Sequence, residues 1–240
     1  MSKHKPISRR SYILLGAALV ICAVSGCQDG PLYALKNVNP YFTMREWRDD
    51  TALGVTDHER RTQLADLATQ IGQMPTNRQK FWSQHLEKMI DNDASPEMRR
   101  LAVSAAGNLK VGDAISLVEK GLDDDSIKVR MEACRALGKR PEEAAARLLA
   151  STAGTEADED VRQAALDAIG NHKGKIALDS LKIALNDRNP ATRDLAIESL
   201  RRVTGKNYGD QPDAWIAALQ GKPVSEQPTR IVDAIRNQWK

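Results

Sequence analysis

Apolar and polar positions follow a helical period through most of the chain, and between about residues 93 and 202 one pattern recurs. Each copy has an acidic residue, an arginine six positions later, an alanine three positions after the arginine, and then an apolar residue. Successive arginines lie 31, 32 and 31 positions apart. The acids are Asp93, Asp124, Glu156 and Asp187, and the arginines are Arg99, Arg130, Arg162 and Arg193.

This recurrence predicts pairs of helices. First helices are expected at 96–107, 126–138, 159–170 and 190–203, and second helices at 112–122, 141–152 and 174–186. An earlier, degenerate pair is expected to begin at residue 57 and to continue over 77–90, with Phe81 among its apolar positions. A single pair cannot bury its apolar face alone. The pattern therefore predicts an all-α protein, an α-solenoid of stacked antiparallel helix pairs.

The repeat Asp124…Arg130…Ala133…Ala136-Leu137-Gly138 resembles the short bacterial type of HEAT repeat, and Glu156…Arg162…Ala165…Ala168-Ile169-Gly170 is similar. The resemblance covers residues 93–220 well and 57–92 loosely. The signature residues of tetratricopeptide and ankyrin repeats, which have nearby periods, are absent.

The HEAT resemblance also implies roles for the recurring polar residues. The acids and arginines are expected to form a structural ladder at the turns between repeats, with a row of anion-binding sites as the alternative. Second helices of HEAT arrays line the concave surface. The candidate partner-binding residues are therefore Ser116, Glu119, Arg147, Asp179 and Lys182. Their mixture of charges favours a protein or peptide partner, although a solvated face would look the same.

The N-terminal residues 1–26 read as an export signal, with a basic start followed by an apolar run. The run ends in Val24-Ser25-Gly26-Cys27, which resembles the bacterial lipobox. That resemblance implies lipidation of Cys27 and attachment to the bacterial cell envelope, facing the periplasm. In lipoproteins, aspartate directly after the modified cysteine favours the inner membrane, so the resemblance, with Gln28 at that position, implies the outer membrane. An ordinary secretory signal and an uncleaved anchor are the alternatives, and Arg9-Arg10 leaves twin-arginine export open.

Four sections of the chain follow from these patterns. They are the lipoprotein signal (1–26), a tether with an aromatic segment (27–56), the repeat domain (57–220), and a linker with a short C-terminal helix (221–240). The aromatic residues of the second section are expected to cover the first repeat or to dock a partner. The terminal helix, carrying Ile231, Ile235 and Trp239, is expected to cover the last repeat, or to dock on a partner or a membrane surface.

Charge and cysteine content narrow the range of possible functions. Removing the signal takes away four basic residues and lowers the formal net charge from +3 to −1, which argues against nucleic-acid binding. Once Cys22 is cleaved off and Cys27 lipidated, Cys134 is alone. It is expected to be a buried apolar residue, with a reactive thiol as the alternative.

No residue pattern supports catalysis, a metal or a cofactor. Deoxyhypusine hydroxylase, an iron enzyme built on similar repeats, needs several His-Glu pairs, and only His58-Glu59 occurs here. Bilin lyases contain similar repeats, but nothing beyond the repeat favours that chemistry. We therefore expect a membrane-anchored scaffold that binds an unidentified envelope protein or peptide. An enzyme or enzyme subunit and a structural envelope protein are the alternatives.

Overall fold

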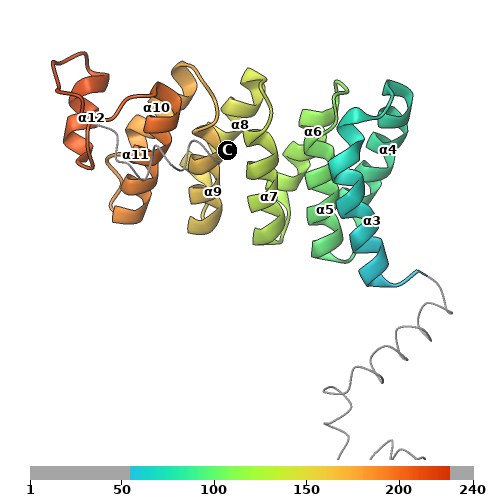
Figure 1. Ribbon diagram of the computed structural model, residues 1–240. Coiled ribbons are helices and arrows are strands. Elements are labelled where there is room, and N and C mark those ends of the chain that lie inside the picture. Colours follow the sequence, from blue (N-terminus) through green and yellow to red (C-terminus); the bar gives the residue numbers. More distant parts are fainter. Residues whose placement is uncertain (1–54, 228–240) are drawn as a thin grey trace, which may run out of the picture. The chain divides into compact units, whose positions relative to one another are not determined.

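The computed structural model describes residues 55–227, and this part of the chain is helical, with no strand. The chain divides into two compact units, Met1–Asp57 and His58–Lys240. The described helices belong to the second unit, apart from the first residue of α3, and Figure 1 labels them in chain order. Their bounds are α3 (Asp57–Gln70), α4 (Thr76–Asn92), α5 (Pro96–Gly107), α6 (Ala114–Lys120), α7 (Ile127–Gly138), α8 (Glu143–Thr155), α9 (Glu159–Ile169), α10 (Lys175–Ala184), α11 (Pro190–Thr204) and α12 (Pro212–Leu219).

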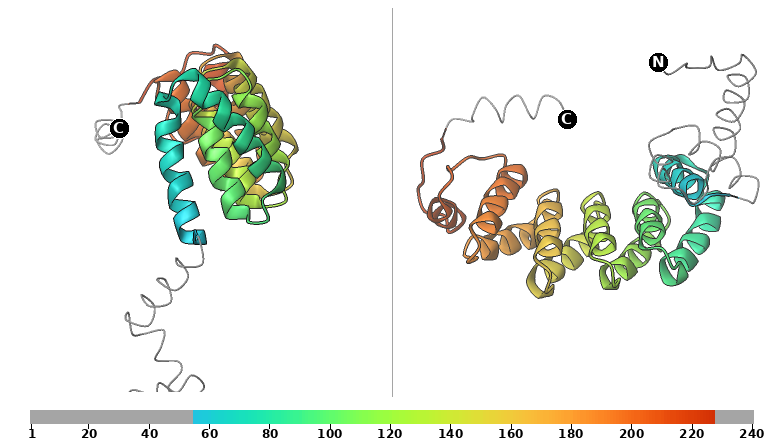
Figure 2. Two further views of the ribbon diagram at one scale, coloured as in Figure 1. Left: turned by 90° about the vertical axis from the view of Figure 1, so that its right-hand side faces the viewer. Right: turned by 90° about the horizontal axis from the view of Figure 1, so that it is seen from below.

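The helices form two adjoining rows. Helices α5, α7, α9 and α11 pack side by side in sequence, and α4, α6, α8 and α10 form the second row beside them. Figure 2 shows the same succession from two further directions. This arrangement is an α-solenoid, and the fold class predicted from the repeat is confirmed.

Helix starts follow local chemistry. Pro96 and Pro190 occupy the first turns of α5 and α11, where proline's missing N–H costs nothing. The side chains of Asp158 and Asn189 accept hydrogen bonds from the first free N–H groups of α9 and α11. The first helices of each pair therefore begin within one residue of their predicted positions.

The second helices differ more from the prediction. Helix α6 is short, and its last turn continues as a 3₁₀ helix, Gly121–Asp123. Helix α8 instead runs to Thr155, three residues beyond the predicted end. Phe81 in α4, predicted as an apolar position, is 53% exposed and stacks on His85 at 4.3 Å between ring centroids.

The core runs through all the described pairs. The alanine column and the column that follows it are almost fully buried, as are three aligned positions of the second helices. These residues are Ala102, Ala133, Ala165 and Ala196; Val103, Cys134, Leu166 and Ile197; and Val118, Leu149 and Leu181. Stacking thus joins the apolar faces of successive pairs into one core.

The glycines that end α5 and α7, Gly107 and Gly138, permit close approach of successive first helices. A Cβ at Gly107 would lie 2.6 Å from the Cβ of Ala136, and one at Gly138 would lie 2.9 Å from the Cβ of Ala168. A side chain at either position would push successive first helices apart. The repeat therefore needs glycine here for space.

The last described helix closes the array. Gly205 ends α11 in a left-handed conformation, at φ 70°, which glycine adopts without strain. The Trp215 side chain in α12 is fully buried, and its indole N–H donates to the Gly209 carbonyl at 2.8 Å. The signal, Cys27, the aromatic segment before residue 55 and the helix predicted after Pro228 lie outside the described residues.

Candidate functional site

The recurring acids and arginines lie at the ends of successive first helices. Arg99 in α5 donates to both carboxylate oxygens of Asp124, at 2.6 and 2.9 Å. The two side chains are only 15% and 8% exposed. Burial disfavours the charged carboxylate, but hydrogen bonds from Arg99 and from the Ser126 N–H outweigh it and hold the pKa of Asp124 below its ordinary value. This contact is a charge-assisted, bidentate link between two repeats.

The next links are progressively looser. Arg130 donates to Glu156 at 3.2 and 3.4 Å. Among the described residues, no ion pair joins Arg162 to Asp187. Instead, Arg162 donates to the backbone carbonyls of Glu156 and Ala157. The Asp187 carboxylate accepts from the Asn189 N–H at 2.7 Å.

Within residues 55–227, the last arginine of the column, Arg193, likewise donates to backbone carbonyls alone, those of Asp187 and Arg188. At the other end, the series extends one repeat further than its sequence pattern. The arginine position of the first pair is occupied by Leu64, which is buried. Arg60, one helical turn earlier, reaches the Asp93 carboxylate at 3.1 Å. Sequence analysis missed Arg60 because it stands outside the register of the repeat.

A second polar column lies at the opposite ends of the first helices. Asn108, Arg140, His172 and Arg202 lie 32, 32 and 30 residues apart. Each donates to a carbonyl near the C-terminal end of the preceding first helix. Asn108 donates to Ala68, and Arg140 donates to Gly107 and Leu109. His172 donates to Leu137, and Arg202 donates to Asp167. We call these four residues the carbonyl-capping column. They add side-chain hydrogen bonds to helix-end carbonyls, of which Leu137 and Asp167 also accept from backbone N–H groups of their own turns.

The candidate partner-binding residues lie on three successive second helices. Ser116 and Glu119 on α6, Arg147 on α8 and Asp179 on α10 are exposed, and Lys182 on α10 is half-buried. Arg147 pairs with Glu143 on its own helix. Beside Lys182, the Ile183 side chain is 75% exposed. The surface therefore combines both signs of charge with one large apolar side chain.

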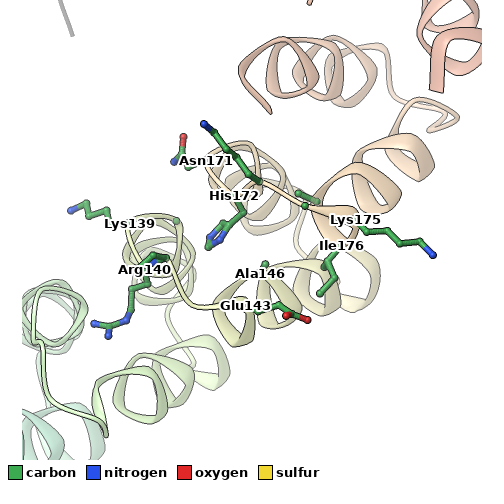
Figure 3. Close-up of a pocket in the computed structure, with 13 residues that line it drawn as sticks. Lys139, Arg140, Glu143, Ala146, Asn171, His172, Lys175 and Ile176 are labelled. Carbon is green, nitrogen blue, oxygen red and sulfur yellow. The ribbon is translucent and has the colours of Figure 1, made fainter. Parts of the chain in front are cut away.

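A pocket of about 620 Å³ opens between the turn joining α7 to α8 and the turn joining α9 to α10 (Figure 3). Lys139, Arg140, Lys173 and Lys175 bring positive charge to its lining, and Glu143 brings one carboxylate. Its size falls within the range of about 300–1,000 Å³ typical of ligand sites. The sequence analysis did not single out this pocket.

Cys134 is fully buried, and its Sγ faces the Val161 carbonyl at 3.9 Å. Burial raises the pKa of its thiol to about 12. The thiol therefore stays protonated at neutral pH, and its surroundings are those of a structural cysteine.

The described part of the chain, residues 55–227, contains no group of three or more His, Cys, Asp or Glu side chains placed to hold a metal ion. None of its helices is both long enough and apolar enough to cross a membrane.

Comparison with known proteins supports the repeat assignment. Residues 83–170 match the family of HEAT repeats, so the chain contains a HEAT-repeat domain. No curated protein matches. Among solved structures, human deoxyhypusine hydroxylase in complex with glycerol is similar at 22% identity and a TM-score of 0.47, over 51% of this chain and 43% of that one. An engineered protein is similar at 18% identity and a TM-score of 0.40, over 69% of this chain and 81% of the other. The chain thus spans less than half the length of deoxyhypusine hydroxylase.

Proposed function

We propose that this protein is a lipoprotein, attached through Cys27, whose HEAT-repeat array serves as a scaffold for another protein on the periplasmic side of a bacterial envelope. The observation that carries the proposal is the order of its parts. A basic and apolar leader ends in Val24-Ser25-Gly26-Cys27, and a helical array follows it. Multiple acyl chains at one site give stable membrane attachment. Gln28 favours the outer membrane as its location.

The exposed surface of the array supports a binding role. Repeat arrays present extended surfaces on which successive helices contribute side chains. Here α6, α8 and α10 contribute Glu119, Arg147, Asp179 and the exposed Ile183. Alternating charges favour a folded protein or a peptide over a uniform polyanion such as nucleic acid.

Attachment is tested by comparing Cys27→Ala with Cys22→Ala in cells. Both substitutions remove a cysteine near the end of the leader, but only the first removes the lipidated residue. We expect Cys22→Ala to be processed and to carry the mass of acyl chains, whereas Cys27→Ala carries none. Equal masses and equal membrane association in the two variants would refute the anchor.

The scaffold role is tested by crosslinking in intact cells, followed by purification and mass spectrometry. We expect one envelope protein to be recovered with the wild type and with Cys22→Ala, and to be lost with Cys27→Ala. Recovery of no discrete partner, together with a metal or cofactor bound in near-stoichiometric amount, would replace the scaffold with an enzyme. Lack of a partner in an abundant protein without such a group would indicate a structural envelope component.

A further inference from the structure

The pocket between the α7–α8 and α9–α10 turns lies where the residue in the carbonyl-capping column changes from arginine to histidine. One repeat earlier, the long Arg140 side chain is 9% exposed and spans the carbonyls of Gly107 and Leu109. His172 occupies the same column but is shorter, and its Nε2 reaches only the Leu137 carbonyl, at 3.1 Å. The space that an arginine would fill is left open beside Gly138 and Arg140.

The positive charge around this pocket is available to a ligand. No hydrogen bond or ion pair within residues 55–227 engages the ammonium groups of Lys139, Lys173 and Lys175. Arg140 is already bound to two carbonyls and to Glu142, and the Glu143 carboxylate is paired with Arg147. The three lysines therefore dominate the uncompensated charge of the pocket.

The arrangement of the lysines suits an extended ligand. Figure 3 shows Lys139 and Lys175 on opposite sides of the pocket, with their side chains directed away from each other. Because they do not converge on one point, they do not form a cage for a single small ion. A chain that crosses the pocket can pair with one lysine at each side.

Part of the lining between the lysines is formed by small or apolar side chains. Ala146 and Ala177 are 5% and 1% exposed, and Ile176 is half-buried. Helices α8 and α10 also begin here without a side-chain cap, so their free N–H groups add to the positive potential. The pocket thus offers an apolar floor within a cationic rim.

We propose that this pocket binds an acidic peptide segment of the partner protein. One aliphatic side chain of the segment packs over Ala146 and Ala177, and carboxylates on either side of it pair with Lys139, Lys173 and Lys175. This inference rests on the proposed scaffold function and names the chemistry of the segment that the scaffold recognises.

The test uses the purified full chain and a fluorescein-labelled peptide in which leucine is flanked on each side by three glutamates. Fluorescence polarisation is measured at about 50 mM salt, where charge pairs are weakly screened. We expect the glutamate peptide to bind about tenfold more tightly than the same peptide with glutamines, since several exposed ion pairs, each weak alone, act together. Replacing leucine with glycine should also weaken binding.

Two variants locate the site. Reversing the charges with K139E, K173E and K175E together should abolish the preference for the acidic peptide. The matched control K80E, K88E and K128E makes the same change in net charge at exposed lysines outside the pocket, and it should retain the preference. His172→Arg should weaken binding by filling the pocket, without changing the far-UV circular dichroism spectrum.

Equal binding of the glutamate and glutamine peptides would overturn the proposal, as would an equal loss of binding in both triple variants. Absence of binding up to about 1 mM peptide, where ΔG° would be weaker than about −4 kcal/mol, would also overturn it. None of these results depends on the lipid anchor or on a cellular partner. A failure here therefore leaves the crosslinking test of the scaffold function unaffected.

Discussion

The link between α5 and α7 and the link between α9 and α11 have the same sequence pattern but different chemistry. In the first, Arg99 donates two hydrogen bonds to the Asp124 carboxylate. In the second, Arg162 and Asp187 stand in the same columns but form no ion pair with each other. The α9–α11 link instead has Asn189 donating to the Glu159 carboxylate near the helix starts, and Arg202 donating to the Asp167 carboxylate at 2.6 Å and to its carbonyl near the helix ends.

The two links share a local contact within one turn and differ in the long-range contact between helices. All four arginines of the column donate to the backbone carbonyl of the acid six residues earlier. This contact depends only on the conformation of one turn, so it survives in every copy. The contact with the following acid depends on how two helices pack, and it varies from bidentate to absent. The repeated pattern therefore determines the hydrogen bonds within each turn more reliably than the ion pairs between neighbouring helices.

The largest effect is expected from a substitution that disrupts the core shared by both links. Leu137→Asp places a charge at a fully buried position in α7, and we expect it to cost about 4 kcal/mol or more, enough to unfold the array. Helicity and thermal unfolding by circular dichroism measure this. Lys128→Asp, on the exposed side of the same helix, is the control and should melt near the wild-type temperature. Wild-type melting of Leu137→Asp would refute the core assignment.

A pair of alanine substitutions compares the two links directly. Arg99→Ala leaves the buried Asp124 carboxylate without its guanidinium partner, and we expect a loss of about 2–3 kcal/mol. Arg162→Ala removes hydrogen bonds to carbonyls alone and should cost about 1 kcal/mol. Urea unfolding midpoints give both values. Equal losses would show that the ion pair adds nothing to the α5–α7 link.

Acid should weaken the first link selectively. Because the pKa of Asp124 is lower in the folded protein than in the unfolded chain, its stabilising contribution is complete above the unfolded pKa. It is lost as the pH falls through the folded pKa. Unfolding midpoints from pH 7 down to about pH 3 should therefore fall less steeply for Asp124→Asn than for the wild type. Parallel pH profiles would contradict the assigned shift.

The smallest effect is expected from a substitution that creates an ion pair between α9 and α11. Asp187→Glu lengthens the side chain to that of Glu156, which does reach its arginine. We expect pairing with Arg162 and a gain of about 0.5 kcal/mol. A double-mutant cycle with Arg162→Ala measures the coupling between the two positions. A gain that persists in the Arg162→Ala background would have another origin.

The sequence predicted the helices well because each one carries its own periodicity and start signals, such as Asn189-Pro190 in α11. It could not show that Gly107 approaches Ala136 closely, since that distance belongs to a pair of helices. The carbonyl-capping column was missed because asparagine, arginine and histidine share a task but no residue type. The pocket was missed because it arises from a difference in size between Arg140 and His172, which only their packed positions reveal.

The candidate partner-binding residues illustrate the same division. Periodicity was enough to place Ser116, Arg147 and Asp179 on the exposed sides of their helices. It could not show that Arg147 is already paired with Glu143, or that Ile183 stands out from α10. Exposure follows from position along one helix, whereas availability to a partner depends on neighbouring side chains.

The carbonyl-capping column gives the array a direction during biosynthesis. Every donor of the column lies later in the chain than the carbonyl it satisfies, as His172 does with Leu137 and Arg202 with Asp167. A repeat leaving the ribosome therefore lacks these side-chain hydrogen bonds to its helix-end carbonyls until the following repeat emerges. Completion of these contacts lags one repeat behind the growing end. Loss of the last repeat by proteolysis would likewise remove side-chain donors from carbonyls of the remaining array, whereas loss of the first would leave one donor without its carbonyl acceptor.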